Sequence, residues 1–212
     1  MSPKVRRHGA SHFPLGRRLW HKNGVMAPPT ARKARPPLDA RRLEDLALRY
    51  VERFATTRAK LRLYLARKLR ERGWEGDPEP DLEAIAERFA SHGYVDDAAY
   101  ALAKSQSLSG RGFGKRRVIE KLRAAGVDEA DGEPAREHAD ENAVISALRF
   151  AERRRLGPFA RTPPRDPKER EKALAAMIRA GHPFALAREI VGLPPGSDVD
   201  LTDLIERFGA HR

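Results

Sequence analysis

The sequence predicts an all-α protein, and three observations support this prediction. From residue 43 onward, apolar residues recur at intervals of three and four, the spacing of one face of an α-helix. Glycine, proline, and acidic or hydroxyl residues separate these runs, as expected at the ends of helices. No segment alternates apolar and polar residues for long enough to indicate a strand. The chain of 212 residues is therefore predicted to form a series of short helices.

The first two helices are predicted between residues 43 and 73. One face of the first carries the apolar side chains Leu43, Leu46, Tyr50, Val51 and Phe54. The second carries Leu61, Leu65 and Leu69 at helical spacing. Thr57 is suited to cap the start of the second helix, and Gly73 marks its end.

Two further helices are predicted on either side of Gly93. Leu82, Ile85, Ala86 and Phe89 define the third helix, which closes at His92 and Gly93. The fourth begins at Asp96 or Asp97, since either carboxylate can accept a hydrogen bond from the first free amides of a helix. The residues predicted to be buried here are Tyr94, Val95, Ala98, Ala101 and Leu102.

The remaining helices follow a glycine-rich segment. Val118, Ile119 and Leu122 line a helix that ends at Ala125 and Gly126. An acidic connector is predicted over 127–142, where Gly132 and Pro134 argue against a long helix. The later helices are predicted over 144–155, 167–180 and 183–192, with a last short one through Leu201, Leu204, Ile205 and Phe208.

A weak internal similarity predicts a repeated architecture. "RKLRERG" (67–73) resembles "EKLRAAG" (120–126), and 90–102 resembles 178–190. Units of about 50 residues indicate an elongated tandem array of about three three-helix units, although chance similarity among Arg, Leu and Ala helices is an alternative. The predicted divisions are a disordered basic tail (1–37), three helical units (38–78, 79–130 and 131–196) and a C-terminal extension with a short helix (197–212).

The charge is concentrated at the N-terminus. The net charge is +12, and residues 1–37 contribute nine basic residues and no acid, while the rest has 33 basic and 30 acidic residues. Such a tail is typical of an arm that contacts nucleic acid; translation from Met26 and a transit peptide are alternatives. No apolar run reaches the length of a membrane span, and the absence of cysteine suits the cytoplasm.

"SGRGFGKRRVIEKL" (109–122) superficially resembles a phosphate-binding loop. A P-loop needs glycine where Ser109 stands and a hydroxyl residue where Arg116 stands, so both ends of the pattern fail. The structural interpretation is that Gly112 or Gly114 permits a positive φ between two helices. Phe113 would then lie in the core, and a basic helix would follow.

Basic and acidic residues are separated by segment, which predicts a surface for a polyanion or an acidic partner. The segments 58–72 and 104–123 each carry seven basic residues against one acid, whereas 75–97 carries eight acids and one arginine. The candidate partner-binding residues are Arg58, Lys60, Arg62, Arg67, Lys68, Arg111, Lys115, Arg116, Arg117, Lys121 and Arg123. A solvated surface without a partner is the alternative.

Catalytic and metal-binding patterns are lacking. The seven histidines are scattered, and His92 and His182 each flank a glycine at the end of a predicted helix. Asp96 and Asp97 are better suited to capping than to acid–base chemistry. The sequence therefore predicts neither an enzyme nor a metal or cofactor site.

The segment 90–128 resembles the signature of the RecX family of recombination regulators. The matching residues include Gly93, Tyr94, Val95, Asp96, Asp97, Tyr100, Ser107, Gly112, Phe113, Gly114, Arg117, Val118, Leu122 and Gly126. Residues 56–73 and 143–194 are similar to the first and third units of the family, so the resemblance covers roughly 43–195. The family often has proline where Lys115 stands and an acid near Arg58.

The resemblance implies a non-catalytic modulator of the RecA recombinase, acting in DNA repair, recombination and the SOS response. Such proteins are curved helical arrays, expected to be monomeric, that lodge in the groove of the RecA filament on single-stranded DNA. They impede filament extension and ATP-driven strand exchange. The alternatives are a helix-turn-helix-like protein that binds duplex DNA through residues 115–123, and a scaffold protein.

Overall fold

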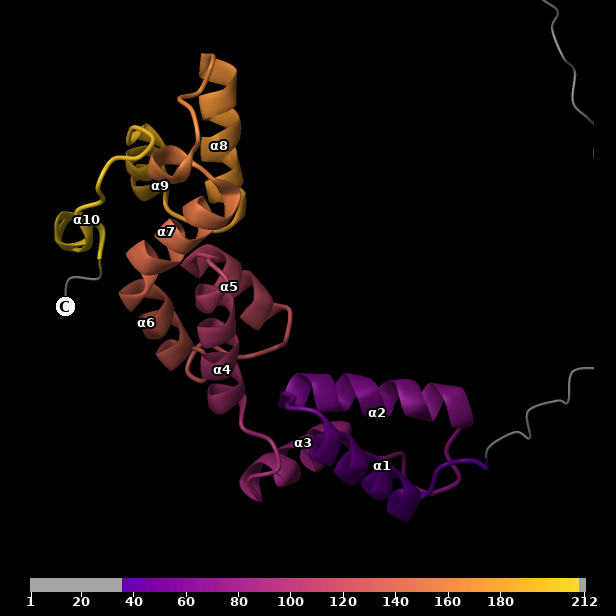
Figure 1. Cartoon of the computed structure of the whole chain (residues 1–212). Coiled ribbons are helices and arrows are strands. Elements are labelled where there is room, and N and C mark those ends of the chain that lie inside the picture. The colour runs from indigo at the N-terminus through magenta and orange to yellow at the C-terminus, as the bar shows by residue number, and fades with distance from the viewer. Residues whose placement is uncertain (1–35, 210–212) are drawn as a thin grey trace, which may run out of the picture. The chain divides into compact units, whose positions relative to one another are not determined.

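The computed structural model describes residues 36–209, and these contain ten α-helices and one short 3-10 helix (Figure 1). The predicted all-α class is confirmed: within the described residues, the only extended pairing is an isolated bridge between Leu38 and Trp74. The predicted disordered tail lies outside this range, apart from Pro36 and Pro37. The helices are α1 (Ala40–Arg53), α2 (Arg58–Arg72), α3 (Leu82–Ser91), α4 (Asp97–Gly110), α5 (Lys115–Arg123), α6 (Glu133–Glu141), α7 (Ala143–Arg154), η1 (Gly157–Phe159), α8 (Pro167–Arg179), α9 (Phe184–Gly192) and α10 (Leu201–Phe208).

Short polar side chains start most of these helices. The hydroxyl of Thr57 accepts a hydrogen bond from the Lys60 N–H at 3.2 Å, as predicted. Asp96 rather than Asp97 caps α4, accepting from the Ala99 N–H at 2.8 Å. Each bond satisfies a backbone donor that has no partner within its own helix. The same residue types cap α1, α3, α8 and α10, through Asp39, Asp81, Asp166 and Asp200.

Three hydrophobic cores follow one another along the chain. The first is filled by α1, α2 and α3, the second by α4, α5 and α6, and the third by α7, α8 and α9 with Leu204 of α10. Ala86 and Phe89 of α3 lie in the first core. The cores therefore divide the helices into three units: α1–α3, α4–α6 and α7–α9. The divisions predicted after residues 78 and 130 instead assign α3 to the second unit and α6 to the third.

One predicted connector contains a helix. Residues 127–142 were expected to lack a long helix, but α6 occupies nine of them. Pro134 is the second residue of α6, a position where its missing N–H removes no intrahelical bond. Ala135 and Ala139, four residues apart, are buried against α4 and α5. No described helix is both long and apolar enough to cross a membrane.

Candidate functional site

The glycine-rich segment is a joint between the second and third cores. Gly112 has φ +76°, and a Cβ atom on it would lie 2.8 Å from the backbone nitrogen of Phe150 in α7. Gly114 has an ordinary φ of −83°, but a Cβ atom there would overlap the backbone of Gly181. The positive φ predicted for one of the two glycines therefore belongs to Gly112. Gly114 is required instead for close approach of two backbones.

Backbone hydrogen bonds hold this joint together. The Gly114 N–H donates to the carbonyl of Ala180 at 3.0 Å, and the Arg116 N–H donates to that of Gly181 at 3.3 Å. The Arg116 guanidinium also donates to the carbonyl of Ile178 at 2.5 Å. Free donors at the start of α5 thus meet free acceptors at the end of α8, so the two helix ends satisfy each other.

His182 and Phe113 complete the joint. The Nε2–H of His182 donates to the carbonyl of Gly112 at 3.1 Å, and the imidazole ring lies 5.6 Å from the ring of Phe150. Burial lowers the pKa of His182 to about 4, an effect that the hydrogen bond to Gly112 only partly opposes. Phe113, predicted to be in a core, is half-buried and packs against both the second and the third cores.

A second joint connects α2 with the end of α5. The hydroxyl of Thr57, which is fully buried, donates to the carbonyl of Ala125 at 2.6 Å. Gly126 has φ +71°, and a Cβ atom there would overlap the side chain of Ala59. The glycine that ends the signature segment therefore touches the first turn of α2.

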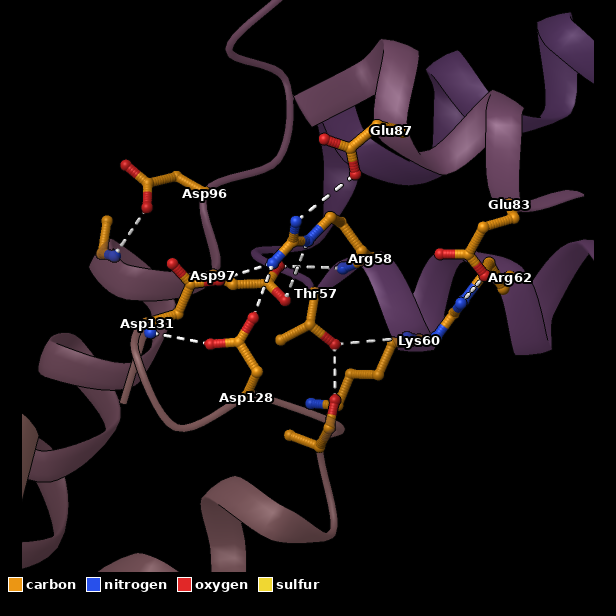
Figure 2. Close-up of polar contacts among 12 residues, drawn as sticks. Thr57, Arg58, Lys60, Arg62, Glu83, Glu87, Asp96, Asp97, Asp128 and Asp131 are labelled. Atoms are coloured by element: carbon orange, nitrogen blue, oxygen red, sulfur yellow. Dashed lines mark hydrogen bonds and ion pairs between the residues drawn. The ribbon is translucent and has the colours of Figure 1, made fainter. Parts of the chain in front are cut away.

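Arg58 is surrounded by acids at this second joint (Figure 2). Its backbone N–H donates to the carboxylate of Asp97 at 2.9 Å. Its guanidinium lies 3.5 Å from Asp97, 3.3 Å from Glu87, 3.3 Å from Asp128 and 2.5 Å from Asp131. Burial lowers the pKa of Arg58, but Asp97 and the other acids outweigh this, and the net shift is upward. Burial and the neighbouring Asp128 raise the pKa of Asp131, while Arg58 opposes that rise.

The two adjacent aspartates of the signature have separate roles. Asp96 is exposed and caps its own helix, α4. The side chain of Asp97 is 3% exposed and bonds to the first residue of α2 instead. Figure 2 shows that the two carboxylates bind different groups, and only that of Asp97 contacts Arg58. Sequence spacing alone left this choice open.

Tyr94 of the signature was wrongly predicted to be buried. Tyr94 is 55% exposed, whereas the neighbouring Val95 is 4% exposed and lies in the core, as predicted. Gly93 has φ +75°, so the chain turns sharply after α3 and presents Tyr94 on the outside of the turn. The aromatic side chain is thus available to a partner.

The other candidate basic residues of α2 have partners within the chain. Lys60 donates to the Tyr100 hydroxyl, and Arg62 pairs with Glu83. Arg67 and Lys68 both contact Glu71, at 3.6 and 2.6 Å. The three ion pairs have exposed carboxylates on Glu83 and Glu71 and contribute little to stability. Arg67 is exposed and stays accessible to a stronger anion, whereas Lys60, Arg62 and Lys68 are half-buried.

The candidate basic residues on and just before α5 differ in whether they bind other residues of the chain. Lys115 pairs with Asp140, Arg117 with Glu120 at 3.0 Å, and the Arg111 guanidinium donates to the Ser107 carbonyl. Lys121 and Arg123 are exposed and make no ion pair with any described residue. The candidates therefore lie on α2 and α5, apart from Arg111, which follows the end of α4.

Sequence reasoning missed the acidic partners of Arg58. Glu87, Asp128 and Asp131 lie 29 to 73 residues from it in the chain. Their segments were recognised as acidic, but no pattern in the sequence links them to one arginine. Within the described part of the chain, no group of three or more His, Asp or Glu residues could hold a metal ion.

The fold and its joints define a helical protein with three successive cores, connected by Asp97, Gly112, Gly114 and Gly126. The chain is 31% identical over 179 residues to the regulatory protein RecX of Myxococcus xanthus, and this alignment covers 79% of the chain and 96% of that protein. It is 33% identical over 178 residues to the RecX of Thermobifida fusca, with coverages of 80% and 86%. The RecX of Agrobacterium fabrum is 28% identical over 151 residues, with coverages of 69% and 80%. No protein-family model matches the sequence. The chain belongs to the RecX family of regulatory proteins.

Proposed function

We propose that the chain is a non-catalytic regulator that binds RecA filaments on single-stranded DNA and inhibits their extension, ATP hydrolysis and strand exchange. It would act as a monomer in the cytoplasm and modulate recombination, DNA repair and the SOS response. Membership of a family of regulatory proteins supports the regulatory role. The RecA target comes from the resemblance of residues 90–128 to the family signature.

The position of the signature residues is the observation that most supports this proposal. Asp97, Gly112, Gly114 and Gly126 each contact a helical unit other than their own, and all but Gly126 are buried. A filament is a periodic partner, so a regulator that contacts several of its subunits needs fixed relations between its own units. The signature residues supply contacts of that kind.

The candidate basic residues fall into two groups, those that hold the joints and those that could contact the filament. Arg58 is held by four carboxylates, so we assign it to the joint rather than to the filament. Arg116 likewise donates to the end of α8. Lys121 and Arg123, exposed on α5 and without ion pairs to described residues, are the strongest candidates for contacts with the filament.

The helix-turn-helix alternative is not favoured by the environment of α5. A recognition helix presents its N-terminal residues to the edges of bases in the major groove. The N-terminal amides of α5 instead face the carbonyls of α8, and its C-terminal end packs on α2. The exposed side chains of α5 are Arg116, Glu120, Lys121 and Arg123, which include no Asn or Gln for reading a base.

The test is the rate of ATP hydrolysis by RecA on single-stranded DNA. We expect the purified chain to inhibit hydrolysis well below an equimolar ratio to RecA, because blocking the growth of one filament end affects many subunits. A Gly114→Val variant should inhibit less, since its side chain would overlap Gly181 and disturb the joint. An unchanged rate together with sequence-specific binding to duplex DNA would refute the proposal.

A further inference from the structure

All four tyrosines of the chain line two adjoining hollows on the surface. One hollow, of about 440 Å³, lies between the end of α1 and the start of α4, and the other, of about 590 Å³, lies along α1 and α2. Both are lined by Phe54 and Ala55, so they form one surface, here called the aromatic groove. Its aromatic side chains are Tyr50, Phe54, Tyr64, Tyr94 and Tyr100.

The aromatic groove exposes large apolar surfaces. Phe54 is 49% exposed, Tyr94 55% and Leu63 70%, and these are three of the six large hydrophobic residues exposed in the described part of the chain. The rings of Tyr50 and Tyr64 stack at 4.2 Å, and Phe54 lies 5.5 Å from Tyr50. A contiguous, solvent-exposed apolar patch of this kind is typical of an interaction site.

The charge around the aromatic groove is strongly positive. Its lining includes four cations (Lys60, Arg67, Arg70 and Lys104) and one acid, Asp96, whose carboxylate is already bonded to the Ala99 N–H. Two of the cations lie over rings: Lys60 is 4.3 Å from the centre of Tyr100, and Arg67 is 5.7 Å from that of Tyr64. Positive charge is thus interleaved with aromatic faces.

We propose that the aromatic groove binds single-stranded nucleic acid. Bases would stack on the exposed rings of Phe54 and Tyr94, while phosphates would be neutralised by the surrounding cations. Aromatic faces beside a basic track are the arrangement that suits an unpaired strand, since each base has a free face and each nucleotide a negative charge. A duplex offers no free base faces, and an apolar peptide would not require four cations. This assignment rests on the proposed function in that the filament carries an unpaired strand.

The experiment compares two labelled oligonucleotides of 15 nucleotides, one of deoxythymidine and one with the same phosphates but no bases. Fluorescence anisotropy with the full-length chain measures both affinities at one salt concentration, so basic segments contribute equally to each. We expect the base-bearing strand to bind at least about tenfold more tightly, as stacking of one or two bases provides. Equal affinities would show that phosphates alone are recognised and would overturn the proposal.

Variants locate the effect. Phe54→Ala and Tyr94→Ala should each reduce the preference for bases by about fivefold or more, while Tyr94→Phe, which keeps the ring, should retain it. The matched control is Phe184→Ala, because Phe184 is similarly exposed at 56% but lies on α9, outside the groove. An unchanged preference in both alanine variants, with native circular dichroism, would overturn the assignment.

The ATP hydrolysis assay separates this proposal from the proposed function. A preference for bases without any effect of the chain on RecA supports the groove and rejects RecA regulation. If Phe54→Ala and Tyr94→Ala abolish inhibition of RecA but keep the preference for bases, the groove docks a protein rather than a nucleic acid. That result would overturn the groove assignment and leave the regulatory function intact.

Discussion

The carboxylate of Asp97 accepts a hydrogen bond from the backbone N–H of Arg58, 39 residues earlier in the chain, at 2.9 Å. The first turn of a helix leaves its N–H groups without intrahelical partners. In α2, Thr57 satisfies the N–H of Lys60 and Asp97 satisfies that of Arg58. The start of a helix in the first unit is therefore completed by a buried side chain of the second, and the two units stabilise each other.

Replacing Asp97 with alanine should destabilise the fold strongly. The change leaves a donor without its partner and removes the most buried of the four acids around Arg58. We expect a loss of about 2–3 kcal/mol in the free energy of unfolding, measured by urea denaturation followed by circular dichroism.

Asp96→Ala is the matched control, since it removes an adjacent but exposed carboxylate that caps only α4. Its expected cost is about 1 kcal/mol, the usual value for an N-cap. An equal or greater loss in Asp96→Ala than in Asp97→Ala would contradict the role assigned to Asp97.

Glycines of the segment 110–114 should differ sharply in their tolerance of alanine. Gly114→Ala should cost about 1–3 kcal/mol, because the new methyl group overlaps the backbone of Gly181 and forces the joint apart. Gly110→Ala should be neutral or stabilising by up to about 1 kcal/mol, since Gly110 is the last residue of α4 and has open space around it. Thermal unfolding of the two variants measures the difference. Similar melting temperatures would show that the joint relaxes freely.

Local patterns were sufficient to predict most helices and their caps. Thr57 and Gly73 bound α2 as expected, because a cap depends only on residues within one turn of the helix end. The helix α6 was missed because Gly132 and Pro134 disfavour a helix locally, whereas burial of Ala135 and Ala139 against α4 and α5 outweighs this. Tertiary packing of this kind is not visible in a local window.

The joints could be predicted only in part. Gly112 and Gly114 stood out in the sequence, but the need for Gly114 arises from Gly181, 67 residues later. Tyr94 was assigned to the core, although the turn at Gly93 places it on the surface. Long-range contacts and the direction of a side chain after a turn depend on the whole fold.

The buried His182 should make stability depend on pH. Its pKa in the folded chain is about 4, below its ordinary value of 6.5, so the unfolded chain gains a proton first as the pH falls. The contribution of the neutral ring to the free energy of unfolding is fully present above about pH 6.5. It is lost progressively as the pH falls to about 4, and the total loss is about 3 kcal/mol. Urea unfolding at a series of pH values measures it.

His182→Gln provides the comparison, because its amide can still donate to the Gly112 carbonyl but does not titrate. Carboxylates such as Asp131 titrate equally in both proteins, so only the difference between the two profiles reports on His182. The expected result is a shallower loss of stability in the variant between pH 6.5 and 4. Parallel profiles over this range would show that the histidine becomes charged in the folded state at no cost.

Charge reversal on α5 should weaken binding to the filament. Lys121→Glu with Arg123→Glu removes two exposed cations that make no ion pair with a described residue, so the fold should keep its stability. The measurement is the anisotropy of the labelled chain titrated with RecA filaments on poly(dT), held by a slowly hydrolysed ATP analogue. If both cations contact phosphates, the slope of log affinity against log salt should fall by about 1.4, since each contact with a single strand contributes roughly 0.7. The control reverses the charge of Lys168 and Lys172 of α8, which are also exposed and make no ion pair with a described residue. This control variant should leave the slope unchanged. Equal changes of the slope in the two double variants would mean that only net charge matters.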